Sequence, residues 1–234
     1  ESTEPKGKAV PYTPTEEERR RHNLAHWPFR EWCGPCVEGR AKDDRHGATA
    51  TGVEGLPVIQ VDFFFVTTRH DDGPDGKVTG ITAVCCGTGA IGGSELPGKT
   101  TGGYAVEFLT SLVKSRGYTD IVLMSDQEPA VQSICEAVAK RRVHRTVPRR
   151  SPKYSHASLG YAEQGNWAME SMLRTLLVHL RQRYRDVEPD EPIVAWALRL
   201  SGWLLTRFRV RPDGRTPFWI LNRREYRGEL AELA

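Results

Sequence analysis

The stretch LPVIQVDFFFVTT, residues 56–68, sets a single acid, Asp62, inside a run of Val, Ile and Phe. These residue types are enriched in strands, so the run predicts a buried β-strand. An unpaired carboxylate in apolar surroundings is costly, and it persists where it has a partner, a metal ion or a catalytic role. Asp62 is therefore the first candidate for a functional residue.

The segments that follow predict an α/β fold. A dense turn, DDGPDGK at 71–77, leads into a returning strand, VTGITAVCC at 78–86. Periodicity predicts helices at 102–118, 128–142, 158–184 and 190–208, and strands at 120–126 and 142–147. The last helix has five large apolar side chains near one face, at Ile193, Trp196, Leu200, Leu204 and Phe208. Strands, then alternating βα units, then helices indicate a mixed sheet.

Two further acids stand where such a fold can gather them. Asp126 ends the strand at 120–126, and Glu163 lies near the start of the long helix. Each alone has a simpler explanation, because Asp126 can cap a helix and Glu163 can be a solvated first-turn acid. Together with Asp62 they can converge on one cleft. Three carboxylates there suit two Mg²⁺ ions, and such ions about 4 Å apart promote in-line phosphoryl transfer.

Basic residues are concentrated before Glu163. The formal net charge is +3, but KRRVHRTVPRRSPK at 140–153 has seven Lys or Arg and no acid. This distribution favours contact with a polyanion, and a solvated charged loop is the alternative. Arg174 and Arg181 come close to the helix face of Glu163. A nucleic-acid backbone beside the acids would explain both features.

The N-terminal part differs in composition. Residues 1–15 are polar with three prolines, which predicts a disordered tail. Residues 16–26 predict a short helix that Pro28 ends. Residues 39–55 are rich in Gly, Ala, Thr and charge, which indicates a linker before the large domain begins near Leu56.

The motif WCGPC at 32–36 matches the dithiol motif of thioredoxin-like oxidoreductases in its letters. Such a motif follows a buried strand and opens a long helix, whereas here a polar segment precedes it and Gly39, Gly47 and Gly52 follow it. The context that lowers a thiol pKa at a helix N-terminus is missing, so a redox role is disfavoured. Five cysteines, two of them neighbours at 85 and 86, fit a reducing compartment better than a disulfide framework.

A metal site accounts for these cysteines better. His22 and His26 are spaced by about one helical turn, and Cys33 and Cys36 form a Cys-x-x-Cys knuckle. Two His and two Cys suit tetrahedral Zn²⁺. The segment has few apolar residues, so metal binding would supply its folding free energy. His46 is a substitute ligand, and a metal-free linker with an incidental Cys-x-x-Cys stays open as an alternative.

Taken together, these motifs resemble the integrase region of an LTR-retrotransposon polyprotein, of the Copia-like or retroviral type. The resemblance covers about residues 20–228. Asp126 and Glu163 are separated by 36 residues, one more than in the D,D-35-E pattern of that family. The resemblance is carried by HNLAH, CGPC, VDFFF around Asp62, SDQEPA around Asp126, SLGYAEQGN around Glu163 and the closing GRTPFWILNRREYRG.

The resemblance implies an α/β fold with an RNase H-like mixed sheet flanked by helices and a small N-terminal zinc-binding module. The implied divisions are a tail at 1–15, the module at 16–47, a linker at 48–55 and the catalytic core at 56–228. The catalytic residues would be Asp62, Asp126 and Glu163, with two Mg²⁺ or Mn²⁺ ions. The Zn²⁺ ligands would be His22, His26, Cys33 and Cys36, and nucleic-acid contacts would come from Arg149, Arg150, Lys153, Asn166 and Arg174.

The implied activity is DNA 3′-end processing followed by strand transfer. Asp62 would bridge both metal ions, and Asp126 and Glu163 would each complete one. Double-stranded DNA, from element ends and target, would be the partner of a homo-oligomer, with no small-molecule cofactor and no membrane. The implied location is the nucleus, or the cytoplasm while the chain is part of a polyprotein.

The sequence also departs from the family. Six residues separate His26 from Cys33, which shortens the zinc module, and Trp167 stands where retroviral sequences commonly have Lys. Between Asp62 and Asp126 lie 63 residues, more than in retroviral cores. Two alternatives stay open. One is a non-catalytic nucleic-acid-binding remnant. The other is an RNase H or transposase, for which Glu128 and Glu170 could supply an extra carboxylate.

Overall fold

The computed structural model describes residues 12–39, 55–67, 77–98, 103–151, 159–184 and 187–231. Most predicted elements are present, and the helices follow their apolar periodicity. In chain order the elements are α1 (Glu16–Asn23), α2 (Gly34–Gly39), β1 (Val58–Thr67), β2 (Lys77–Cys85), β3 (Ile91–Leu96), α3 (Gly103–Ser115), β4 (Ile121–Ser125), α4 (Pro129–Arg141), β5 (Thr146–Arg150), α5 (Gly160–Arg183), α6 (Pro192–Phe208) and α7 (Pro217–Asn222).

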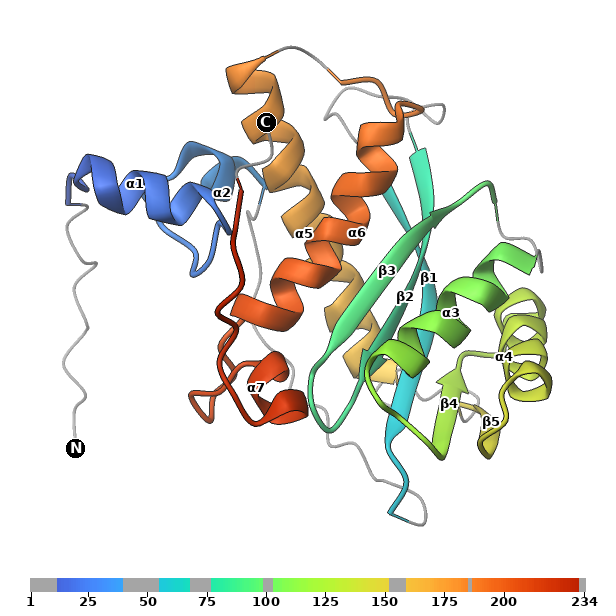
Figure 1. Cartoon of the computed structure of the whole chain (residues 1–234). Coiled ribbons are helices and arrows are strands. Elements are labelled where there is room, and N and C mark those ends of the chain that lie inside the picture. The colour runs from blue at the N-terminus through green and yellow to red at the C-terminus, as the bar shows by residue number, and fades with distance from the viewer. Residues whose placement is uncertain are drawn as a thin grey trace, which may run out of the picture.

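The strands form the predicted mixed sheet. Its order is β3-β2-β1-β4-β5, with β1 antiparallel to β2, β2 antiparallel to β3, and β1, β4 and β5 parallel. Parallel neighbours need crossover connections, which α3 and α4 supply. Figure 1 shows the twisted sheet with α3 and α4 on one side and α5 and α6 on the other.

Each face of β1 belongs to a different apolar core, which explains the uninterrupted apolar run in its sequence. Ile59, Val61 and Phe63 pack with side chains of α3 and α4. Phe64 and Val66 pack with side chains of α5 and α6. Since side chains alternate along a strand, Asp62 points to the α5 face.

One strand was missed by the sequence analysis. Strand β3 lies within a Gly-rich stretch for which the sequence analysis predicted no strand. Its glycines permit close packing rather than a loop: a Cβ on Gly202 of α6 would lie 2.9 Å from the Cα of Gly92, and a Cβ on Gly93 would lie 2.7 Å from Met169 Cε. Glycine in a strand often marks such a close approach.

Smaller differences concern the ends of elements. Strand β5 begins at Thr146, four residues later than the predicted 142–147 strand. The helix predicted at 16–26 ends at Asn23, and Thr15, which we placed in a disordered tail, closes a capping box with Glu18. On α6, the predicted apolar face is only partly covered, since Trp196 is 50% exposed. Thr216 caps α7 by accepting a hydrogen bond from the Trp219 backbone N–H, and Pro217 is the first residue of the helix.

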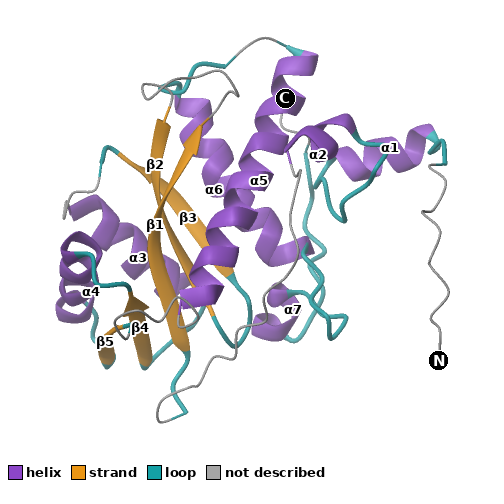
Figure 2. Ribbon diagram, turned by 180° about the vertical axis from the view of Figure 1, so that it is seen from behind, coloured by secondary structure: helices purple, strands orange, loops and turns teal. Residues whose placement is uncertain are grey.

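The N-terminal helices α1 and α2 pack beside α5 and α6, away from α3 and α4, as Figures 1 and 2 both show. Among the described residues, no helix is both long and apolar enough to cross a membrane.

Candidate functional site

Asp62 lies in the middle of β1, opposite Thr82 of β2 in the strand register. Its side chain is partly buried and faces the helix α5. The Asn166 amide of α5 donates a hydrogen bond to Asp62 Oδ2 over 2.8 Å and a second to the Phe63 carbonyl over 3.2 Å. The Thr82 hydroxyl donates to Asn166 Oδ1, which orients the amide so that its NH₂ group faces the carboxylate.

A second polar contact fixes the start of α5 against β1. Gln60, buried two residues before Asp62, accepts a 2.9 Å hydrogen bond from the Ala162 backbone N–H. Helix α5 also comes very close to β2, because a Cβ on Gly165 would lie 2.4 Å from Val84 Cγ2. These contacts place Glu163, an exposed first-turn acid, one turn before Asn166 and thus on the side of Asp62.

Asp126 follows β4, which pairs in parallel with β1. Its Oδ1 accepts a 2.9 Å hydrogen bond from the backbone N–H of Glu128, the N-cap residue of α4. Glu128 rather than Asp126 is the N-cap residue of α4, so the capping explanation for Asp126 is wrong, and this hydrogen bond engages only one of the two carboxylate oxygens. The charge of Asp126 also acts on Asp62: burial, then the Asp126 carboxylate, raises the pKa of Asp62 to about 6.

Asp62 lies against the first turns of α5, which carry Glu163, and Asp126 is close enough to raise the pKa of Asp62, but the three acids do not form a tight ligand set. Of the His, Cys, Asp and Glu side chains that the structure describes, only His22, His26, Cys33 and Cys36 have ligand atoms all within 4.8 Å of one another. Three carboxylates repel each other, and Mg²⁺ accepts oxygen ligands with waters completing its shell. The donor chemistry of Asp62, Asp126 and Glu163 thus fits Mg²⁺, with Asp62 and Asp126 the electrostatically coupled pair.

The predicted nucleic-acid contacts lie in different surroundings. Arg149 and Arg150 are exposed on β5, where Arg150 pairs in register with Ser125, the residue before Asp126. A long ion pair of 3.8 Å joins Arg150 to Glu136. Arg174 is only partly exposed and pairs with Glu170 over 3.6 Å. Lys153 falls outside the described residues, and Asn166 points inward to Asp62.

The four predicted zinc ligands come together at the N-terminus, and all four are buried. His22 Nε2 lies 3.3 Å from Cys36 Sγ, and His26 Nδ1 lies 3.5 Å from Cys33 Sγ. The prediction that one helical turn brings both histidines together needs a correction: α1 ends at Asn23, and His26 adopts a left-handed backbone with φ 49°. His46, the substitute ligand, falls outside the described residues.

The chemistry of this cluster matches zinc better than a redox dithiol. Hydrogen bonds from Cys36, His22 and His26 lower the pKa of Cys33 and favour its thiolate, which both a metal site and a redox dithiol require, so the surrounding structure distinguishes the two. The preceding residues form no strand, and the following α2 has six residues. The thioredoxin-like arrangement is therefore absent around these described cysteines, as the sequence context predicted.

The cluster is joined directly to α5. The ring of His179 lies edge-on to His26 with centroids 5.1 Å apart, and Trp32 covers His22 at 4.9 Å. Helix α2 packs so closely that a Cβ on Gly39 would lie 2.6 Å from the Thr175 backbone nitrogen. One helix thus contacts the acid site with its first turns and the His-His-Cys-Cys cluster with its later turns.

Sequence reasoning missed Gln60, Thr82 and His179. Gln60 lies two residues before Asp62 in the same strand, and this polar position on the face of Asp62 was a usable signal. Thr82 and His179 have no such local signal, because their partners lie 84 and 153 residues away in the sequence.

Neither a protein-family model nor a curated protein matches this sequence. Solved structures do match its fold. The HTLV-2 integrase catalytic core domain in complex with magnesium aligns with 72% of this chain and 99% of its own, at 18% identity and a TM-score of 0.51 for the trimeric form. Its dimeric form aligns over the same shares at 17% identity and a TM-score of 0.50.

A simian T-cell lymphotropic virus intasome in complex with PP2A regulatory subunit B56 gamma also matches, at 17% identity and a TM-score of 0.54. The match covers 83% of this chain and 66% of that chain, slightly less than two thirds. These likenesses establish the fold. The chain has the mixed five-stranded sheet and flanking helices of retroviral integrase catalytic cores, with a His-His-Cys-Cys cluster on its N-terminal side.

Proposed function

We propose that this protein is an integrase of the retrotransposon or retroviral type, a metal-dependent polynucleotidyl transferase acting on double-stranded DNA. The observation that carries the proposal is the surroundings of Asp62: a partly buried carboxylate, coupled to Asp126 and held by Asn166 one turn after Glu163. A fold like that of integrase cores supports the assignment, and the Copia-like or retroviral subtype rests on the sequence motifs.

Asp62, Asp126 and Glu163 would hold two Mg²⁺ ions, which supply charge neutralisation and activate the attacking hydroxyl at neutral pH. The chain itself does the positioning. Asn166 fixes the Asp62 carboxylate, and Gln60 fixes the turn of α5 that carries Glu163. Arg149 and Arg150, at the edge beside Asp126, would hold phosphates of the DNA backbone. The products are a processed 3′ end and its joined target strand.

The N-terminal residues 16–47 would form a zinc module with His22, His26, Cys33 and Cys36 as ligands. Zinc there would fix the contact of α1 and α2 with α5 rather than take part in the reaction. The HTLV-2 core is described in dimeric and trimeric forms and the simian virus protein in an intasome. By analogy we propose a homo-oligomer on DNA.

The test is resealing of a labelled branched duplex that mimics a strand-transfer product, with Mg²⁺ or Mn²⁺. Asp62→Asn, Asp126→Asn and Glu163→Gln should each lower the rate by about a thousandfold, since metal-held charge contributes several kcal/mol to the transition state. Asp190→Asn, an exposed acid before α6, is the matched control and should leave the rate unchanged.

Wild-type activity in the Asp62→Asn variant would rule out this triad. A folded wild-type protein that binds DNA but never reseals it would favour a non-catalytic binding remnant. Cleavage of an RNA–DNA hybrid in place of resealing would favour an RNase H-type nuclease on the same fold.

A further inference from the structure

The C-terminal segment 207–227 concentrates arginine on a second region of the molecule. It contains seven arginines, no lysine and two acids, Asp213 and Glu225. Four aromatic residues are interleaved with them: Phe208, Phe218, Trp219 and Tyr226. Arginine combined with aromatic side chains is typical of surfaces that bind nucleic-acid backbones and bases.

One of these arginines has a structural role and is set aside. Arg207 lies over the rings of Trp203 at 4.0 Å, Tyr226 at 5.1 Å and Phe218 at 5.4 Å. This aromatic cluster is partly buried and fastens the segment after α7 to α6. Arg207 is therefore explained by packing.

Arg215 and Arg223 are different, because both are exposed and both stack on one indole. Their guanidinium carbons lie 4.6 Å and 5.8 Å from the Trp219 ring centroid. Asp213 accepts a hydrogen bond from the backbone N–H of Arg215, not from its guanidinium. Within the described residues neither guanidinium has a carboxylate partner. Trp219 thus contacts two guanidinium groups that have no carboxylate partner among the described residues.

The backbone at Arg223 strengthens this observation. Arg223 ends α7 in the left-handed region with φ 56°, a position where Gly or Asn is usual. A long charged residue with a Cβ is disfavoured in that conformation. Helix termination alone does not require an arginine at this position. The guanidinium of Arg223 instead contacts Trp219, which gives the arginine another role.

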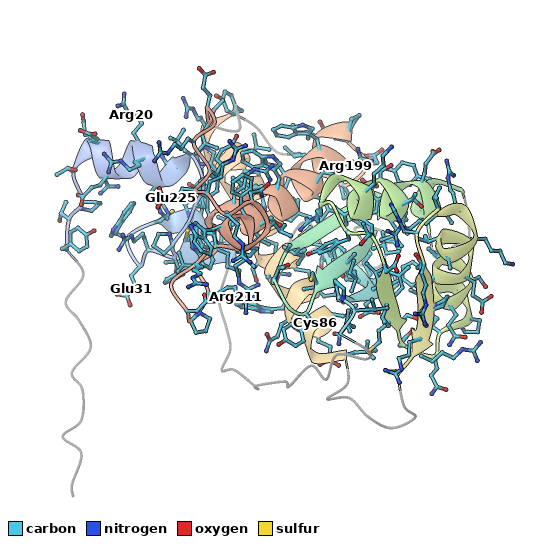
Figure 3. All side chains as sticks on the ribbon, turned by 60° about the horizontal axis from the view of Figure 1, so that its bottom comes forward. Arg20, Glu31, Cys86, Arg199, Arg211 and Glu225 are labelled. Carbon is cyan, nitrogen blue, oxygen red and sulfur yellow. The ribbon has the colours of Figure 1, made fainter. Side chains whose placement is uncertain are left out.

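This region contacts the β2–β3 turn, which in turn lies near the start of α5. Arg211 Nη1 donates a 2.6 Å hydrogen bond to the Gly87 carbonyl in the turn between β2 and β3. The neighbouring Cys86 packs in one small apolar cluster with Tyr161, two residues before Glu163. Figure 1 shows α7, this turn and the start of α5 at the same end of the molecule, and Figure 3 shows Arg211 and Cys86 at the face brought forward.

We propose that Arg211, Arg215, Trp219 and Arg223, the arginine surface, bind the phosphate backbone of the DNA duplex that enters the acid site. The proposal rests on the proposed function for the identity of the polyanion. Guanidinium groups bind phosphate oxygens in a planar, bidentate way, and two of them on one ring can span adjacent phosphates. Because the surface adjoins the start of α5, one duplex can contact both.

The experiment measures binding, so it is independent of catalysis. Fluorescence anisotropy of a labelled duplex of about three helical turns, without divalent cations, gives the association constant from about 50 to 200 mM KCl. Arg223→Gly is the first variant, because Gly suits the left-handed backbone and the fold should be retained. Arg215→Gln is the second. Arg20→Gln, an exposed arginine of α1, removes the same charge elsewhere.

Each variant of the arginine surface should reduce the slope of log K against log salt by about 0.9, which is about eightfold weaker binding at 0.1 M salt. The double variant should show about twice that change, and Arg20→Gln none. An unchanged slope in folded Arg215→Gln and Arg223→Gly proteins would overturn the proposal. The proposal would also be overturned if the variants lost binding to polyglutamate while binding DNA as the wild type does. That result would indicate an acidic protein partner.

Failure of the proposed function gives a different pattern. If the wild type does not reseal DNA but the arginine variants have a reduced salt slope, the proposed function fails and the arginine surface still binds nucleic acid. If the wild type reseals DNA but the variants have an unchanged salt slope, the arginine-surface proposal fails and the proposed function stands.

Discussion

At the scale of single residues, the Asp62 site depends on a chain of two hydrogen bonds that begins at Thr82. The Thr82 hydroxyl is fully buried and donates to Asn166, whose amide then donates to Asp62. Thr82→Val keeps the shape but removes the donor, so Asn166 Oδ1 is left without its partner at a cost of about 1–3 kcal/mol. We expect a loss of about 1 kcal/mol in transition-state stabilisation, or about fivefold in resealing rate.

Thr82→Ser is the control for this prediction, because it restores the hydroxyl while losing the methyl group. The readout that separates positioning from simple destabilisation is the pH at which Asp62 titrates, followed by NMR of the carboxyl carbon. Loss of the Asn166 hydrogen bond should raise that pH in Thr82→Val and leave it unchanged in Thr82→Ser. Equal titration in all three proteins would assign Thr82 a packing role.

Asp62 itself should make the fold less stable as pH rises. Its pKa is about 6 in the folded protein against an ordinary value of 3.8, so the folded state binds more protons between these values. Stability therefore falls as pH increases from about 4 to about 6, where the unfolded chain has already lost the proton. Allowing for its partial exposure, the change is at most about 2 kcal/mol.

Urea unfolding at pH 4.5 and pH 7 tests this directly. Asp62→Asn should flatten the dependence and be more stable than the wild type at pH 7. Mg²⁺ should also raise wild-type stability at pH 7, because it binds the ionised form. The same pH dependence in Asp62→Asn and wild type would show that Asp62 is not its source.

Residue by residue, the sequence predicted what local patterns encode. Asp62 stood out because its neighbours are apolar, and His22, Cys33 and Cys36 stood out by type and spacing. Thr82 was invisible, because a Thr in a strand is common and its contact with Asn166 depends on how α5 crosses β2. Such contacts follow from tertiary packing, which no sequence period reports.

At the scale of elements, the close approach of α6 to β3 shows why β3 was missed. Glycine lowers strand propensity, yet Gly92 and Gly93 of the edge strand β3 are buried where neighbouring helices leave no room for side chains. Strand β5 was predicted too early in the sequence for a related reason. It contains Pro148 and two arginines, which an edge strand tolerates but which hide the apolar alternation typical of a strand. Helices with clear periodicity, such as α4 and α5, were predicted to within a few residues.

Gly202→Ala tests this close approach. The new Cβ would lie 2.9 Å from the Cα of Gly92 and 3.3 Å from the nitrogen of Gly93, so backbone must shift. Overpacking of this kind costs about 1–3 kcal/mol, measured as a lower urea midpoint. Gly103→Ala, where nothing lies within 4 Å of the new Cβ, should be neutral or stabilising by up to about 1 kcal/mol. Equal stability of the two variants would contradict the packing explanation.

At the scale of the whole molecule, α5 connects two sites of different chemistry. Its first turns carry Glu163 and Asn166, and its later turns carry Thr175 and His179 against the His-His-Cys-Cys cluster. A cavity of about 480 Å³ lies where α1, α5, α6 and the C-terminal segment meet, lined by His26, Leu176, Trp203 and Leu230 among others. The sequence separated these parts by composition, but it contained no signal that they pack together.

This arrangement predicts that zinc removal affects the N-terminal side first. The segment around the cluster has few apolar residues of its own, so without metal its contact with α5 should be lost while the sheet persists. Cys36→Ala should lower bound zinc from one ion per chain to a small fraction, measured by elemental analysis. The bond after Arg30, exposed and close to the cluster, should then become sensitive to trypsin.

Cys86→Ala is the matched control, because Cys86 is also buried but lies directly after β2, in another apolar cluster. It should keep one zinc per chain and the wild-type cleavage pattern. A chelator should reproduce the Cys36→Ala pattern in the wild type and change nothing further in the variant. If the chelated protein instead unfolded cooperatively as a whole, the cluster and the sheet would form one folding unit, and α5 would transmit zinc loss directly to Asp62.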